Sequence, residues 1–232
     1  TKLITINRED YERAKEKFAK YTDVLYMNGV GIDLSRFSQI TEDENINIRN
    51  LLGYTKDDFI ISVVAELNKN KNQSLLIKEI PKLREAIPNL KVVFLGKETL
   101  PIARELAEKL DLLDVCQFMG YRRDVDLFEK ICDICFSASL REGLPVNIIE
   151  GMACGKVCIC STNRGHRSLI ESGKNGLIFD VNNPNQMVDD ILKVYREKDF
   201  AYGLSSAACN DAKQYDVKNA IDFTTRLYEN LL

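Results

Sequence analysis

From residue 58 onward, short apolar runs alternate with amphipathic stretches. The apolar runs lack strict alternation, as expected for parallel strands that are buried on both faces. They predict strands at residues 59–65, 91–95, 115–118, 134–137, 157–160 and 176–179. Helices are predicted between them, near residues 73–87, 100–110, 125–131, 145–154 and 166–172, and Pro81 is expected to kink the first. This order predicts an α/β fold with a doubly wound parallel sheet and right-handed crossovers.

The two ends of the chain follow different patterns. Residues 3–7 and 24–27 are predicted strands on either side of an amphipathic helix at 8–21, and a short helix is predicted at 45–52. A strand that opens a chain has an edge that needs a partner. Beyond Pro184 the pattern is helical, with helices predicted at 184–196, 200–213 and 217–231. We therefore expect a helical C-terminus on a Rossmann-like sheet.

Composition narrows the functional classes. The 232 residues are 45% hydrophobic and 29% charged, with a net charge of −3 and no block of lysine and arginine, so nucleic-acid binding is not expected. No apolar run approaches the ~20 residues of a membrane span, and no signal peptide precedes Leu3, which predicts a cytoplasmic protein. The seven cysteines lie mostly in apolar runs, as buried thiols do in a reducing compartment.

Four of these cysteines have spacings that superficially suit a zinc site: Cys132, Cys135, Cys154 and Cys158. Cys135 and Cys158 fall in predicted central strands, where side chains alternate between faces, and the pairs lack the flanking glycines of a zinc knuckle. We therefore expect buried packing for these thiols and no metal site.

The stretch from Ser137 to Cys160 contains the most informative pattern. Proline is tolerated at the first turn of a helix and glycine is favoured just past its end, so Pro145 and Gly155 mark a helix. This mostly apolar helix contains Glu150, and Glu142 precedes it by a separation on the order of 10 Å if the spacing is helical. The two carboxylates are too far apart to share a proton, but they could hold opposite ends of an elongated ligand. Free N–H groups and the positive helix end lie between them.

This string resembles the Glu-x7-Glu signature of the retaining, nucleotide-sugar-dependent glycosyltransferases with the GT-B fold, here of the bacterial exopolysaccharide and capsule type. Further positions match the signature at Ser139, Gly143, Pro145, Met152, Ala153 and Gly155. The resemblance implies transfer of a hexose from a nucleoside diphosphate to a hydroxyl of a glycan or lipid-linked acceptor, with retention of configuration and no cofactor. It implies that Glu142 is the catalytic residue and binds the hydroxyls of the donor sugar, and that Glu150 binds the ribose hydroxyls. The N–H groups of Gly143 and Leu144 would face the diphosphate.

The resemblance also assigns roles to loops that follow other strands. Lys71 matches the lysine that neutralises the donor diphosphate, whereas Glu66 stands where the family has an arginine. The nucleobase would lie near Gly120, Tyr121 and Arg122. We interpret His166 as structural. Arg141 and Arg164 are expected to face the same crevice, where either could contact phosphate or sugar, but we favour ordinary surface arginines. We discount a metal role for the string Asp124-Val125-Asp126, because Asp124 suits a helix N-cap.

The same resemblance predicts the domain organisation. Residues 1–27 would be the remnant of an N-terminal Rossmann-like domain, joined by the link from Asn28 to Asp33 to a nucleotide-sugar-binding domain at 28–232. The chain would then lack most of one domain, be inactive alone, and reach a membrane surface only through the missing part. Two alternatives stay open, namely a non-catalytic nucleotide- or partner-binding module and a nucleotide-sugar epimerase.

Overall fold

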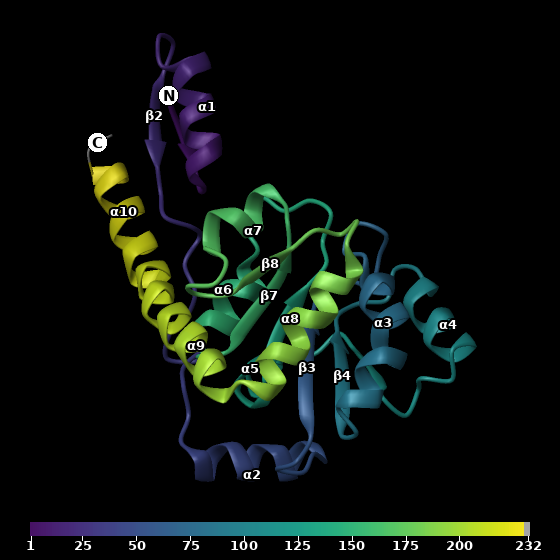
Figure 1. The fold of residues 1–232 in the computed structure, drawn as a ribbon. Coiled ribbons are helices and arrows are strands. Elements are labelled where there is room, and N and C mark those ends of the chain that lie inside the picture. Colours follow the sequence, from purple (N-terminus) through teal and green to yellow (C-terminus); the bar gives the residue numbers. More distant parts are fainter. Residues whose placement is uncertain (230–232) are drawn as a thin grey trace.

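The computed structural model describes residues 1–229 and divides them between a small N-terminal unit and a larger α/β body (Figure 1). The N-terminal unit consists of β1 (Lys2–Thr5), α1 (Arg8–Phe18) and β2 (Asp23–Tyr26), with β1 and β2 paired in parallel. Asn7 caps α1 by accepting a hydrogen bond from the N–H of Asp10. The predicted strand–helix–strand pattern is therefore confirmed for this unit.

The body is built on a six-stranded, all-parallel sheet. Its strands run in the order β5-β4-β3-β6-β7-β8, so the direction of winding reverses between β3 and β6. Ligands of such sheets bind at the carboxyl ends of the strands at this switch point. The doubly wound parallel sheet that the sequence predicts is confirmed. The strand bounds are β3 (Phe59–Val64), β4 (Leu90–Leu95), β5 (Cys116–Gly120), β6 (Ile134–Ser137), β7 (Val157–Ser161) and β8 (Leu177–Phe179).

Helices connect the strands much as the hydrophobic pattern predicts. Their bounds are α2 (Glu42–Leu52), α3 (Gln73–Ala86), α4 (Ile102–Lys109), α5 (Val125–Ile131), α6 (Val146–Ala153) and α7 (Arg164–Leu169). The capping box of Thr41 and Glu44 begins α2, three residues earlier than the sequence predicts. Helix α3 continues through Pro81, whose ring lies inside the assigned helix.

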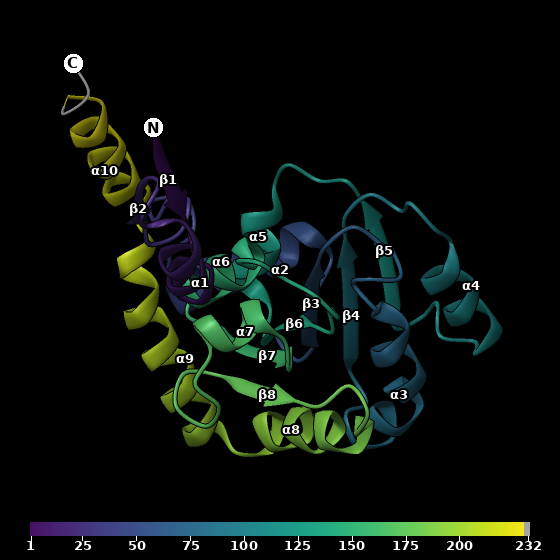
Figure 2. The same ribbon diagram turned by 90° about the horizontal axis from the view of Figure 1, so that it is seen from above.

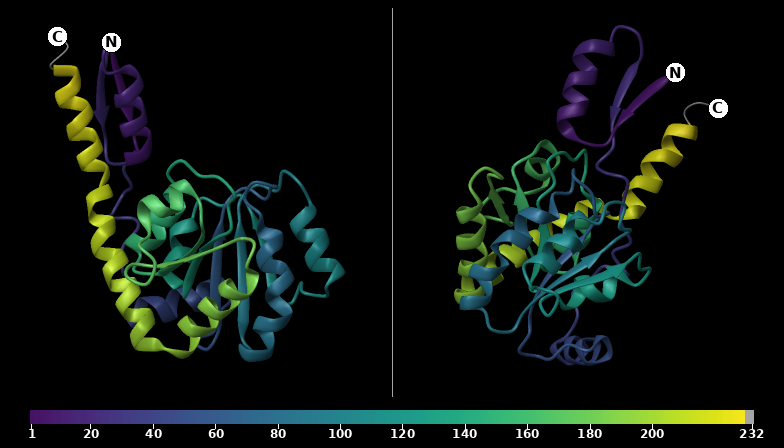
Figure 3. Two further views of the ribbon diagram at one scale, coloured as in Figure 1. Left: turned by 45° about the horizontal axis from the view of Figure 1, so that its top comes forward. Right: turned by 90° about the vertical axis from the view of Figure 1, so that its right-hand side faces the viewer.

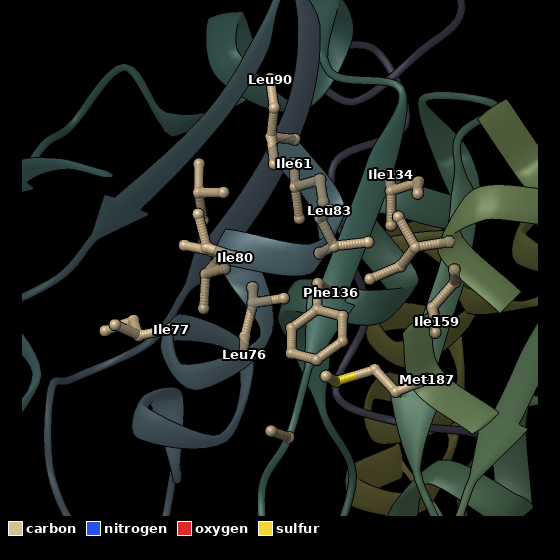
Figure 4. Packing of buried hydrophobic residues seen from close by; sticks show 14 of the residues in the cluster. Ile61, Leu76, Ile77, Ile80, Leu83, Leu90, Ile134, Phe136, Ile159 and Met187 are labelled. Atoms are coloured by element: carbon tan, nitrogen blue, oxygen red, sulfur yellow. The ribbon is translucent and has the colours of Figure 1, made fainter. Parts of the chain in front are cut away.

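Two hydrophobic clusters cover the two faces of the sheet. The first contains residues of α3, α4 and α8 (Pro184–Arg196) packed on β3, β4, β6 and β7. Figure 4 shows Leu76, Ile80 and Leu83 of α3 pointing toward Ile61 and Phe136 on the strands. The second cluster contains residues of α5, α6, α7 and α9 (Lys198–Ala212) on the other face, and Figure 2 shows the sheet between these layers. Because both faces are covered, the polar edge at the strand ends is the free surface of the sheet.

The last helix, α10 (Val217–Glu229), extends from the body along the N-terminal unit (Figure 3). Residues of α10 share a cavity with Lys2 and Leu25, so helix and unit face one another. Where the chain passes from the unit to the body, Ile32 forms a parallel bridge with Asp216 at the start of α10. An added Cβ at Gly31 would lie 2.6 Å from the Cα of Val217, so this link requires glycine.

Candidate functional site

The loops after β3 and β6 meet at the switch point of the sheet through Lys71 and Glu142. The Nζ of Lys71 lies 2.6 Å from the Oε1 of Glu142, and both side chains are mostly buried. The loops are also joined by their backbones, because Leu140 N–H donates to Asn70 O at 2.8 Å and Asn70 Nδ2 donates to Arg141 O at 3.1 Å. The two residues that the sequence assigns to diphosphate and sugar therefore lie together in a rigid setting.

Glu142 lies in the irregular loop between β6 and α6. Gly143 and Leu144 follow it, and Pro145 is the N-cap of α6 instead of its first helical residue. Within residues 1–229, the N–H groups of Gly143 and Leu144 donate to no protein group. A Cβ added to Gly143 would meet nothing within 4 Å, so open space lies in front of this backbone. Unpaired N–H groups at a helix N-terminus form an anion site.

Glu150 lies on α6, one side-chain layer behind these loops. Its carboxylate is half-buried and makes no hydrogen bond or ion pair within the described chain. Burial raises the pKa of Glu150 to about 7, with Arg36 opposing and Asp126 adding to the rise. The carboxylate oxygens of Glu150 are not among the fully buried polar atoms that lack a partner, so they can accept hydrogen bonds from the hydroxyl groups of a ligand.

His166 belongs to a buried polar network behind Glu142. Its backbone N–H donates to Asn163 Oδ1 at 3.0 Å, and its Nδ1 lies 2.7 Å from the carbonyl oxygen of Ser161. Ser161 Oγ and Asn163 Nδ2 both donate to the carbonyl oxygen of Ser139, at 2.6 and 2.8 Å. Burial lowers the pKa of His166 to about 4, so the imidazole is neutral at physiological pH. This network joins the loop after β7 to the loop that carries Glu142, which agrees with the structural role expected for His166.

Two cavities open at this edge of the sheet. The first, of about 560 Å³, is lined by residues of the loops after β6 and β7: Leu140, Arg141, Glu142, Gly143, Thr162, Asn163 and Arg164. The second, of about 400 Å³, lies over the ends of β3, β4 and β5 and is lined by Val64, Ala65, Glu66, Leu95, Gly96, Lys97, Tyr121, Arg122 and Val125. Glu142 itself lines the first cavity, and Lys71 comes from the loop after β3, whose first residues, Ala65 and Glu66, line the second. An elongated ligand laid across this edge would pass over the ion pair.

The predicted base-contacting segment lies at the second cavity. Gly120 ends β5 with a φ of 65°, and the exposed Tyr121 and the half-buried Arg122 line the cavity. Arg122 pairs with Asp124, so Asp124 occupies the N-cap position of α5 without making the expected capping bond. Asp126 pairs with Arg36 and Lys130. Both carboxylates of the Asp124-Val125-Asp126 string are thus occupied by cationic side chains.

The cysteines pack in the interior, away from these loops. Six of the seven are buried, and all are free. Within residues 1–229, one group of three candidate metal ligands lies close together, formed by Glu129, Cys132 and Cys135. Cys154 and Cys158 are not part of it, so the four-cysteine set suggested by the spacing does not form.

Several contacts at the site could not be inferred from sequence patterns. Arg36 donates to Asp126 beside Glu150 across 90 positions of the chain, and Arg164 donates to Asp10 across 154. Arg141 and Arg164 line the first cavity together, as expected of two residues that face one crevice. None of these residues stands out by periodicity or by a motif of its own.

Comparisons with known proteins agree with this geometry. The family model described as "Glycosyl transferases group 1" matches residues 44–215. The putative glycosyltransferase EpsD of Bacillus subtilis is 33% identical over 227 residues, and a UDP-Gal:alpha-D-GlcNAc-diphosphoundecaprenol alpha-1,3-galactosyltransferase of Escherichia coli is 22% identical over 240. The chain is covered to 97% and 100%, but it spans only 60% and 61% of these relatives.

Solved structures show the same fold. Anabaena HepE in complex with UDP and glucose superposes with a TM-score of 0.84 at 19% identity, over 98% of this chain and 62% of HepE. Sucrose-phosphate synthase from Thermosynechococcus elongatus gives 0.85 at 17% identity, over 99% of this chain and 58% of the synthase. Among residues 1–229, no helix is both long enough and apolar enough to cross a membrane. Because the family model matches residues 44–215, which is well over half of the chain, the chain belongs to the glycosyl transferases group 1 family.

Proposed function

We propose that this chain is the donor-binding part of a cytoplasmic glycosyltransferase that transfers a hexose from a nucleoside diphosphate to an acceptor hydroxyl with retention of configuration. The observation that carries the proposal is the Lys71–Glu142 pair at the switch point, flanked by the unpaired N–H groups of Gly143 and Leu144. A cation and two N–H donors suit a diphosphate, and a carboxylate beside them suits the hydroxyls of the attached sugar.

The proposed reaction requires the site to stabilise negative charge on the leaving nucleoside diphosphate. The bond between the anomeric carbon and the diphosphate oxygen breaks, and its electron pair stays on the diphosphate. The acceptor oxygen forms the new bond on the same face, and its proton passes to the leaving diphosphate. Donors that are already oriented toward the developing charge lower the barrier without reorganising. These hydrogen-bond donors are Lys71, from the loop after β3, and the N–H groups of Gly143 and Leu144, just before α6.

Glu142 and Glu150 hold the two ends of the donor in this proposal. Glu142, fixed by Lys71, accepts hydrogen bonds from the sugar hydroxyls and is the catalytic residue. Glu150 has no internal donor and accepts the ribose hydroxyls. The base then occupies the second cavity against Tyr121 and Arg122, where the lining is mostly apolar.

The acceptor and the remainder of the protein are inferred from relatives. The Escherichia coli relative is named for a galactosyl transfer to a diphosphoundecaprenol-linked sugar, and relatives in Campylobacter jejuni are named for transfers to similar acceptors. We infer that the acceptor here is a glycan or a lipid-linked sugar. Because the chain spans about 60% of the curated relatives it matches, we expect donor binding from it alone and transfer only from a longer protein.

A thermal-shift panel tests donor binding directly. UDP-, GDP- and ADP-sugars are added to the chain, and a donor that binds the folded state raises the melting temperature. Glu150→Ala should lower the affinity for the free nucleotide. Glu142→Gln should leave the affinity for the free nucleotide unchanged and should lower only the affinity for the nucleotide sugar. Equal and negligible effects of the two variants in a titration would remove both assigned roles.

Product analysis separates transfer from the alternatives. A protein spanning the full length of the relatives is incubated with the bound donor and a polyprenyl-diphosphate sugar. A glycosylated acceptor with the anomeric configuration of the donor supports the proposal. A new nucleotide-sugar epimer indicates an epimerase, and nucleotide binding without any product indicates a non-catalytic module. Glu66, in place of the family arginine, is the feature of this chain that favours the last outcome.

A further inference from the structure

Two arginines on the rim of the first cavity have no role in the donor site described above. Arg141 precedes Glu142 in the loop after β6, and Arg164 begins α7 after β7. Both line the cavity beside Glu142 and Gly143. The donor diphosphate already has Lys71 and the N–H groups of the α6 N-terminus, and the base cavity lies over the opposite half of the sheet. The first cavity therefore carries two cationic side chains that the proposed function leaves unassigned.

The two guanidinium groups differ in their partners. The side chain of Arg141 is exposed and makes no hydrogen bond or ion pair within residues 1–229, while its carbonyl oxygen is held by Asn70 Nδ2 at 3.1 Å. The backbone is thus anchored and the guanidinium is free. Arg164 Nη1 lies 2.6 Å from Asp10 Oδ1, with both side chains about one-third exposed. Asp10 belongs to α1 of the N-terminal unit, so the rim lies where that unit meets the body (Figure 1).

We propose that Arg141 and Arg164 form a second diphosphate- or phosphate-binding site, which takes the anionic group of a phosphorylated acceptor while the donor occupies the ion pair behind it. The inference rests on the proposed function for the position of the donor. Guanidinium groups bind phosphate oxygens in a bidentate way and are always charged, so two of them on one rim suit a diphosphate better than a neutral glycan. The acceptor class is therefore a phosphate-linked sugar.

Asp10 acts as an internal competitor in this arrangement. Its carboxylate occupies Arg164 in the absence of ligand, and a phosphate group must displace it to form both contacts. Because Asp10 and Arg164 lie on different units, ligand binding at the rim exchanges a bond between the units for one to the acceptor. Removing the carboxylate frees Arg164 and should tighten anion binding.

The test uses inorganic pyrophosphate as the probe, titrated calorimetrically into the chain saturated with the nucleoside diphosphate that binds most tightly among UDP, GDP and ADP. Saturation fills the donor site, so heat from pyrophosphate reports a second site. The variants are Arg141→Gln, Arg164→Gln and Asp10→Asn, and Arg196→Gln on the far helix α8 is the matched control. Each variant is also titrated with the nucleotide alone.

We expect each cavity arginine variant to weaken pyrophosphate binding at least fivefold, with nucleotide affinity within twofold of the parent. Asp10→Asn should tighten pyrophosphate binding two- to fivefold, and Arg196→Gln should leave it unchanged. Pyrophosphate affinity unchanged by Arg141→Gln and Arg164→Gln would overturn the second site. If the arginine variants lowered the affinity for the nucleotide as much as that for pyrophosphate, the two arginines would belong to the donor site instead. A chain that binds pyrophosphate through the arginines but binds no nucleotide contradicts the proposed donor site and leaves the arginine site standing.

Discussion

Gly165 rests directly against Glu142: a Cβ added to Gly165 would lie 2.7 Å from the Cβ of Glu142 and 2.9 Å from its carbonyl oxygen. The loop after β7 thus packs on the backbone of the residue assigned to the donor sugar. Buried hydrogen bonds from Ser161 Oγ and Asn163 Nδ2 to the carbonyl oxygen of Ser139 also join these two segments. The position of Glu142 is therefore set by two strands and not by its own loop alone.

Gly165→Ala should displace the Glu142 segment. The added methyl group has no room, and overpacking typically destabilises a protein by about 1–3 kcal/mol. We expect a lower melting temperature together with a weaker preference for donor sugar over free nucleotide. Gly203→Ala is the matched control, since Gly203 lies in α9 with nothing within 4 Å of its added Cβ and should gain stability as a helical alanine. Normal sugar preference in Gly165→Ala would show that Glu142 does not depend on this contact.

Lys71→Met should weaken nucleoside diphosphate binding about tenfold to a hundredfold, the range of one charge-assisted contact of 1.4–2.8 kcal/mol. The affinity for the corresponding nucleoside should stay the same, because the lysine is assigned only to phosphate. Isothermal titration with both ligands measures the difference. Lys78→Met, on the exposed side of α3, serves as the control. Equal losses for nucleoside and nucleotide would mean that the substitution disturbs the pocket as a whole.

Glu150 should make stability depend on pH. Burial raises the pKa of Glu150 from 4.5 to about 7, so the folded state binds its proton more tightly than the unfolded state. The contribution of Glu150 to the free energy of unfolding is fully present below pH 4.5, and it is lost as the pH rises from 4.5 to about 7. Glu150→Gln removes that loss, so its gain over the parent should grow between pH 5 and pH 8, by about 1–3 kcal/mol. Urea unfolding at both pH values provides the measurement, and a gain independent of pH would contradict the assigned burial.

Arg49→Met should be among the most destabilising substitutions on α2. The buried guanidinium of Arg49 donates to the carbonyl oxygens of Thr55, Asp58 and Ile131, and it pairs with Asp133 at 3.3 Å. Methionine leaves these acceptors unpaired, which should lower the free energy of unfolding by about 3–5 kcal/mol. Arg84→Met breaks an exposed pair with Asp114 and should cost less than about 1 kcal/mol. Similar losses for the two variants would show that Arg49 acts only as surface charge.

The sheet was predictable because each strand is a short apolar run bounded by polar or glycine residues. The element bounds differ by at most three residues within the described part of the chain, as at α6, where Pro145 serves as the N-cap. Glu142 and Glu150 belong to one motif and Lys71 matches a lysine of the resembling family, so the chain alone indicated that Glu142 and Lys71 follow strand ends and that Glu150 lies on the next helix. The ion pair between Lys71 and Glu142 joins two such predicted loops.

The remaining contacts depend on packing between segments that are distant in the chain. Arg36 reaches Asp126 because the fold places the link after β2 against α5, and Arg164 reaches Asp10 because it places α1 against α7. Surface arginines and aspartates occur throughout the sequence, so no local pattern selects these pairs. The Arg122–Asp124 contact shows the same limit at short range, since a side-chain pair replaces the capping bond that the residue type suggests.

The bridge between Ile32 and Asp216 brings the link from the N-terminal unit and the start of α10 to one point. The chain enters the body there after β2 and leaves it there into α10, with Ile32 N–H donating to Tyr215 O and Val217 N–H donating to Ile32 O. The N-terminal unit and the helix that lies along it are therefore anchored to the body at the same place, and the Arg164–Asp10 pair is a second tie between the unit and the body.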